Sequence, residues 1–135
     1  MKYIKKFESQ ENVILKIELA KPIVNLINKV DPSCEYSFLA GTYGNDGGVW
    51  IISKKTNSIL ITIDGCLFDE SKIQISVFSK LPEKLNEFLQ EIFKSQNTFD
   101  IFYVKIKNLK EYINKLNWKN YKNFKINKEA EKYNL

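Results

Sequence analysis

The stretch that decides the fold runs from Tyr36 to Phe78 and reads YSFLAGTYGNDGGVWIISKKTNSILITIDGCLFDESKIQISVF. Short apolar runs in it are separated by turns rich in glycine, asparagine and aspartate, a pattern typical of β-strands joined by tight connections. Parallel strands need a crossover of about a dozen residues or more, so connections this short predict antiparallel pairing. The expected strands are Tyr36–Tyr43, Val49–Ser53, Ile59–Ile63 and Ile73–Phe78.

On the N-terminal side of this stretch, one helix is expected. Pro22 suits the first turn of a helix, and an apolar stripe with the spacing i, i+3, i+4, i+7 follows from Ile23 to Val30. Asp31-Pro32 is expected to end it. The preceding segment, Val13–Leu19, is predicted to be a strand or an extended piece.

On the C-terminal side the hydrophobic period is again helical. A second helix is predicted from Pro82 to about Lys94, and a fifth strand from Phe99 to Ile106. Asn108 and Glu111 have the spacing of a capping box, which predicts a last helix. That helix is expected to bury a stripe of four apolar side chains: Leu109, Tyr112, Ile113 and Leu116.

These elements predict a two-layer α+β fold, with a mostly antiparallel sheet of about five strands and helices packed on one face. A chain of 135 residues has the size of a single domain, so residues 1–135 are expected to form one unit. Its Lys/Asn-rich C-terminal segment, 119–135, is expected to lose regular structure, apart from a short strand at Tyr121–Ile126.

The composition predicts a soluble, cytoplasmic protein. Apolar residues make up 44% of the chain and charged residues 27%, a globular balance. The basic start, Met1–Lys6, is followed by polar residues where a signal peptide has an apolar core, and no apolar run approaches the length that spans a bilayer. Two cysteines, Cys34 and Cys66, are too few for a disulfide framework and are expected to be reduced.

The absence of two residue types disfavours catalysis. All 21 basic residues are lysine, and histidine is absent. Histidine is the commonest general base and metal ligand, and arginine is the residue that binds phosphate through two parallel hydrogen bonds. We therefore expect no enzymatic activity, no catalytic residues, no metal site and no cofactor.

The glycine-rich segment Gly41–Gly48 permits two interpretations. Its glycine spacing superficially resembles that of a phosphate-binding loop, but the Lys-Ser/Thr pair is missing and a strand follows rather than a helix. Asp46-Gly47 between two β runs is a strong hairpin signal. The hairpin is the favoured interpretation.

Two acidic groups are candidates for a partner-binding surface. Glu83, Glu87 and Glu91 have the i, i+4, i+8 spacing that aligns carboxylates along one helix face. The turn that begins at Asp64 adds Phe68, Asp69 and Glu70. These groups are either solvated surface or the site that receives a basic protein partner.

The basic end of the chain is the second candidate. Residues 105–135 hold nine lysines and three glutamates, whereas residues 1–104 hold twelve lysines and thirteen acidic residues. Aromatic rings alternate with lysines in this end, so rings would stack on bases while lysines hold phosphates, or the rings cover the end of the core. The residues concerned are Trp118, Lys119, Tyr121, Lys122, Phe124 and Lys125.

A small cytoplasmic α+β chain without catalytic motifs resembles the bacterial immunity proteins that neutralise a co-encoded toxin, for instance in contact-dependent inhibition. The resemblance lies in the overall format of the whole chain. It implies a rigid fold, a tight interface with a cognate toxin domain and no chemistry of its own. A toxin-blocking protein is therefore the leading hypothesis. The alternatives are a single-stranded nucleic-acid-binding domain and a small enzyme that works without histidine or metal.

Overall fold

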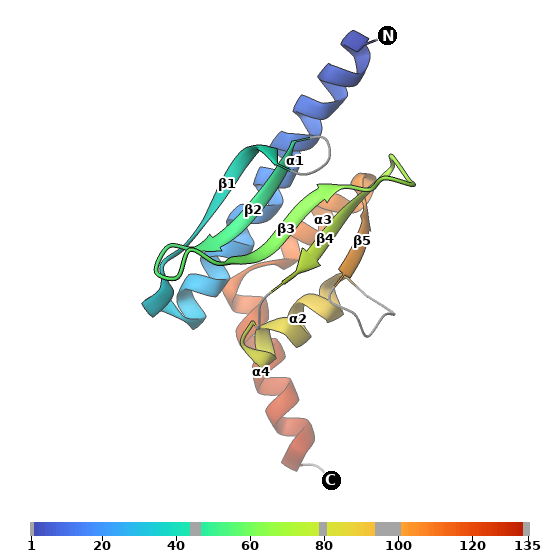
Figure 1. The fold of residues 1–135 in the computed structure, drawn as a ribbon. Helices are drawn as coiled ribbons and strands as arrows, with labels where there is room; N and C mark the ends of the chain where they lie inside the picture. Colours follow the sequence, from blue (N-terminus) through green and yellow to red (C-terminus); the bar gives the residue numbers. More distant parts are fainter. Residues whose placement is uncertain (1, 44–46, 79–80, 94–100, 134–135) are drawn as a thin grey trace.

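The sheet is an antiparallel meander. The computed structural model describes residues 2–43, 47–78, 81–93 and 101–133. Its strands are β1 (Tyr36–Tyr43), β2 (Gly48–Ser53), β3 (Ile59–Gly65), β4 (Lys72–Val77) and β5 (Ile101–Lys105). They lie side by side in chain order, and each neighbouring pair is antiparallel (Figure 1). The prediction of an α+β fold with an antiparallel sheet is confirmed.

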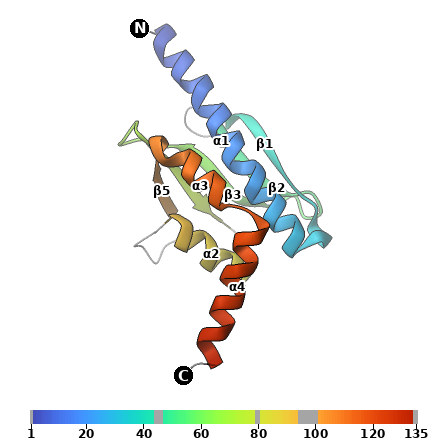
Figure 2. The ribbon, with the colours of Figure 1, turned by 180° about the vertical axis from the view of Figure 1, so that it is seen from behind.

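The helices lie together on one face of this sheet, as Figure 2 shows. The described chain contains α1 (Lys2–Val30), α2 (Glu83–Phe93), α3 (Leu109–Lys115) and α4 (Trp118–Tyr133). Short 3₁₀ turns lie at Pro32–Cys34 and Ile106–Asn108. The predicted helix end at Lys94 and strand start at Phe99 fall outside the described residues.

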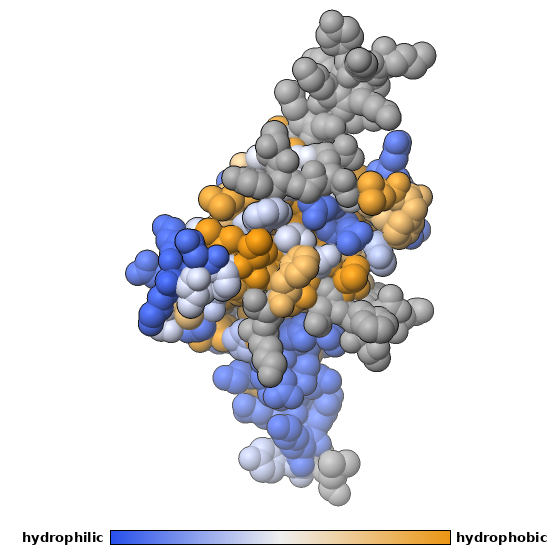
Figure 3. Space-filling model, in the orientation of Figure 1, coloured by the Kyte–Doolittle hydropathy of each residue, from blue (hydrophilic) through white to orange (hydrophobic). Residues whose placement is uncertain are grey.

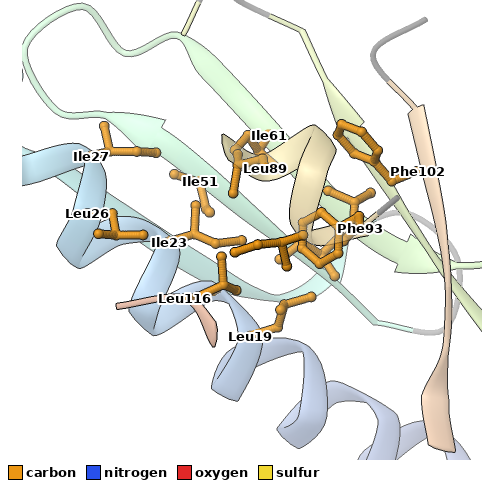
Figure 4. Packing of buried hydrophobic residues seen from close by; sticks show 14 of the residues in the cluster. Leu19, Ile23, Leu26, Ile27, Ile51, Ile61, Leu89, Phe93, Phe102 and Leu116 are labelled. Atoms are coloured by element: carbon orange, nitrogen blue, oxygen red, sulfur yellow. The ribbon is translucent and has the colours of Figure 1, made fainter. Parts of the chain in front are cut away.

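The core forms where alternate strand residues meet the helices. Residues that face each other across neighbouring strands, such as Ile51 and Ile61 or Ile75 and Phe102, point to the helical side and are buried. Leu19 and Ile23 of α1 and Leu89 of α2 pack into the same hydrophobic cluster (Figure 4). A single cluster thus joins both layers.

The predicted strand Val13–Leu19 is wrong, because this segment belongs to α1. Pro22 lies inside that helix rather than at its start. The buried positions Lys16, Leu19, Ala20 and Ile23 have the spacing i, i+3, i+4, i+7, which continues the predicted stripe toward the N-terminus. A lysine occupies the first of these positions, and it concealed the helical period in the sequence.

The predicted end of this helix is confirmed, since α1 ends at Val30. The side chain of Asn28 then fixes the start of β1. Its Nδ2 donates to the carbonyl oxygen of Tyr36 at 2.9 Å, and its Oδ1 accepts from the Tyr36 N–H at 2.7 Å. Asp31 Oδ2 accepts a further hydrogen bond from the Tyr36 hydroxyl at 2.9 Å. Side-chain hydrogen bonds therefore tie the end of α1 to the start of β1.

The C-terminal segment is also corrected. Residues expected to be an irregular tail with a strand at Tyr121–Ile126 form α4. Asn117 begins this helix, because its Oδ1 accepts a hydrogen bond from the Asn120 N–H at 2.8 Å. Asn108 precedes α3 as predicted but makes no capping hydrogen bond with its side chain. An asparagine cap of the predicted kind is therefore found at α4 and not at α3.

Replacing Ile23 by alanine tests the packing of α1 on the sheet. Ile23 is fully buried, and such truncations cost about 2–5 kcal/mol because they leave a cavity. The free energy of unfolding, measured in urea, is expected to fall by about 3 kcal/mol. Ile14→Ala is the control on the same helix, since Ile14 is 57% exposed, and it should change stability by less than about 1 kcal/mol. Equal losses in both variants would contradict this packing.

Candidate functional site

The outer face of the sheet, opposite the helices, carries large side chains that reach solvent. One row of paired positions crosses all five strands on this face: Leu39, Trp50, Thr62, Ser76 and Ile101. The two hydroxyl side chains at its centre are nearly buried, whereas Leu39 is 42% exposed. The accessible part of this row is therefore apolar.

A pair of aromatic rings adds to this face at the other edge of the sheet. Tyr103 on β5 lies opposite Gln74 of β4, on the side away from the core. Phe68, from the turn between β3 and β4, contacts it edge-to-face with ring centroids 5.3 Å apart. Phe68 is 72% exposed and Tyr103 is 39% exposed. The turn thus places an aromatic side chain over the edge of the sheet.

Figure 3 shows this outer face, with hydrophobic residues over the middle of the sheet and at the β3–β4 turn. We call the set Leu39, Trp50, Ile52, Phe68 and Tyr103 the outer-face patch. Polar residues separate its two parts, the middle of the sheet and the β3–β4 turn. Exposed apolar side chains gathered on one face of a small protein mark an interaction site more often than single scattered ones do. Only Phe68 among these residues was predicted. The exposure of Trp50 and Tyr103 on this face could be predicted from the alternation of strand residues, because each lies directly beside a residue that faces the core.

The structure separates the two predicted acidic groups. Asp64, Phe68, Asp69 and Glu70 lie at or beside the β3–β4 turn, whereas Glu83, Glu87 and Glu91 lie on α2. Figure 1 places this turn and α2 at opposite ends of the sheet. The seven residues therefore do not form one surface.

Asp69 acts within its own turn. Its Oδ1 accepts hydrogen bonds from the N–H of Ser71 at 2.9 Å and from the Ser71 hydroxyl. Its Oδ2 lies 3.7 Å from the ammonium of Lys72. The hydrogen bonds from Ser71 lower the pKa of Asp69, helped by the Lys72 charge. This carboxylate shapes the turn, while neighbouring Glu70 is exposed.

Asp64 has a different environment, at the end of β3. Its Oδ1 is buried and has no hydrogen-bond partner among the described residues. Burial raises the pKa of Asp64, and the positive charge of Lys16 and a hydrogen bond from Thr62 oppose this only in part. Lys16 is completely buried in α1. A buried lysine close enough to act on a half-buried aspartate was not predicted from the sequence.

A groove between α2 and α4 collects acidic side chains. Its volume is about 580 Å³, and its charged lining is Glu87, Glu91, Lys128 and Glu131.

 The Lys128 ammonium forms an ion pair with the Glu131 carboxylate at 3.7 Å, and the Glu87 carboxylate lies 4.0 Å from the Lys84 ammonium. Glu83, the third residue of the predicted acidic face, does not line this groove.

The predicted nucleic-acid residues all lie on α4, but two of their rings are not accessible. Tyr121 and Phe124 are 4% and 9% exposed, and both contact the buried ring of Phe88 at about 5.5 Å between centroids. Burial raises the pKa of the Tyr121 hydroxyl. These rings cover the end of the core, as one of the two interpretations predicted. Successive bases cannot stack on them in this arrangement.

Three of the other residues of that set line a second groove, between the end of α1 and α4. Its volume is about 440 Å³, and its lining includes Lys29, Trp118, Lys122 and Lys125. The Lys29 ammonium lies over the indole of Trp118, 5.3 Å from the ring centroid. Lys119 is exposed and does not line the groove. The contribution of Lys29 was not predicted, because it comes from a helix distant in sequence.

Other predicted features have structural roles. The hairpin prediction for Gly41–Gly48 is confirmed, since β1 and β2 pair up to Tyr43 and Gly48, although residues 44–46 lie outside the described chain. Gly47 has φ +69°, and a Cβ there would lie 2.6 Å from Val13 Cγ2. Cys34 and Cys66 are free thiols.

No group of three or more His, Cys, Asp or Glu side chains in the described part of the chain is arranged to hold a metal ion. None of the described helices combines the length and the apolar character needed to cross a membrane.

Comparison with known proteins found no matching family model, no matching curated protein and no matching solved structure.

Replacing Asp64 by asparagine tests the cost of its buried charge. A raised pKa in the folded state means that folding disfavours the carboxylate, so Asp64 lowers stability above its folded pKa and this cost disappears as the pH falls below the unfolded value. Asp64→Asn is therefore expected to raise the thermal midpoint at pH 7, with a smaller gain at pH 3, in calorimetry.

Asp69→Asn is the matched control, because its pKa is shifted in the opposite direction. Its carboxylate stabilises the fold above the unfolded pKa, and that contribution is lost as the pH falls through the lowered folded value. This variant should lower the thermal midpoint at pH 7 and have less effect at pH 3. A lower midpoint for Asp64→Asn at pH 7 would contradict the assigned cost.

Proposed function

We propose that this chain is a non-catalytic binding protein that neutralises a protein partner in the cytoplasm, as an immunity protein blocks its cognate toxin. The observation that carries the proposal is the outer-face patch, an apolar and aromatic surface on the side of the sheet opposite the helices. Aromatic side chains in such patches supply much of the energy of protein–protein interfaces.

The position of the patch suits a rigid docking surface. Leu39 and Tyr103 lie on the two edge strands, and Trp50 lies between them on β2. Backbone pairing across all five strands holds these side chains in fixed positions. Binding then requires little ordering of the chain, and less conformational entropy is lost on association.

The charged residues beside the patch indicate the chemistry of the partner. Glu70 is exposed in the same turn as Phe68, and the Asp69 carboxylate is already shared with Ser71 and Lys72. The surface therefore fits a partner with apolar side chains at its centre and a basic group near Glu70. Of the predicted acidic residues, those at the β3–β4 turn belong to this surface, and those on α2 do not.

The test uses the protein encoded by the neighbouring gene as the candidate partner. Co-expression with this chain is expected to rescue growth from that protein, and the two purified proteins are expected to form a complex in calorimetric titration. Phe68→Ser and Leu39→Ser should each weaken the complex at least about tenfold, because each removes an exposed apolar side chain of the outer-face patch.

Ile14→Ser is the control, since Ile14 is an exposed apolar residue on α1, which packs on the opposite face of the sheet. It should bind and rescue as the unchanged chain does. Absence of a complex, or full binding by both Phe68→Ser and Leu39→Ser, would contradict the proposal.

A further inference from the structure

We infer that the groove between α1 and α4 is a binding site for an acidic peptide segment that also carries apolar side chains. The inference is independent of the proposed function, because this groove lies among the helices and the outer-face patch lies on the opposite side of the sheet.

The charge of the groove is the first argument. Lys29, Lys122 and Lys125 converge on it from two helices, and Glu129 is the one acidic residue among the described residues that line it. None of the three lysines forms an ion pair with a carboxylate within the described chain. Lysines gathered in a concave surface without acidic partners produce a positive potential that attracts anions.

The apolar lining is the second argument, and it indicates what carries the negative charge. Val30 and Trp118 line the groove together with Ile126, which is 62% exposed. A free inorganic anion makes no use of such surface. A peptide with alternating carboxylate and apolar side chains uses both, since its carboxylates meet the ammonium groups while its apolar side chains cover Ile126 and the indole.

The same geometry disfavours a nucleic acid. Single-stranded binding depends on several rings that stack on successive bases. Trp118 is the one ring of the predicted set that is not buried, and it already contacts Tyr121 and the Lys29 ammonium. One partly covered ring gives little surface for base stacking, so a peptide is the better fit.

The experiment titrates the chain with a synthetic capped peptide of alternating glutamate and leucine. Trp50→Phe leaves Trp118 as the one tryptophan, so a change in tryptophan emission reports on the groove. Calorimetry with the unsubstituted chain gives a second readout that does not depend on this variant. We expect saturable binding at low salt that weakens as salt is added.

Charge reversals locate the site. Lys122→Glu and Lys125→Glu should each weaken peptide binding about tenfold or more, as expected for a lost charge-assisted contact. Lys119→Glu makes the same change of charge on the same helix outside the groove, and it should leave binding within about twofold. A peptide with glycine in place of leucine should bind more weakly than the leucine peptide.

Several results would overturn the inference. They are no binding of the peptide at low salt, an equal loss in the Lys119→Glu variant, and tighter binding of single-stranded oligothymidylate than of the peptide. A mass that rises with protein concentration, and that Lys122→Glu returns to the monomer, would also overturn it, because the groove would then be occupied by a second copy.

Discussion

The fold depends on the burial of one face of α1 against one face of the sheet. Ile23 and Leu19 of the helix meet Ile51 and Ile61 of the central strands, and this contact closes the hydrophobic cluster that α2 and α3 complete. Hydrophobic burial is the dominant favourable contribution to folding. Because the described helices all pack on one side of the sheet, the other side stays exposed and carries the outer-face patch.

The helical layer also distributes charge. α4 packs on the core through the buried rings of Tyr121 and Phe124. Residues of α4 on one side of these rings therefore lie near α1, and those on the other side lie near α2. Toward α1 they form a groove rich in lysine, and toward α2 a groove rich in glutamate. A helix with little net apolar character thus separates two surfaces of opposite charge, which composition by segment does not reveal.

Local patterns in the sequence were sufficient for most of the fold. Turn residues and alternating apolar residues placed four strands within one or two residues, and they indicated antiparallel pairing correctly. The long first helix was missed because buried Lys16 interrupts its apolar stripe and Pro22 looked like a start. α4 was missed because only two of its side chains are buried, which leaves too weak a helical period to recognise.

The candidate surfaces were less predictable, since they are assembled from distant segments. Phe68 was recognised within its turn, but its contact with Tyr103 depends on how β4 pairs with β5. In the same way, Trp118 and Lys122 were recognised without Lys29, which the packing of α1 against α4 supplies. Tertiary packing also buries Tyr121 and Phe124, so neither ring is available to bind a partner.

The helices cover the inner face of the sheet, and we propose that a protein partner binds the outer face. Methyl cross-saturation from the neighbouring gene's product to this chain tests it most directly. We expect attenuated methyl signals for Leu39 and Ile52, with unchanged signals for buried Ile61 and for Ile126 on α4. Attenuation at Ile126 without attenuation at Leu39 and Ile52 would contradict it.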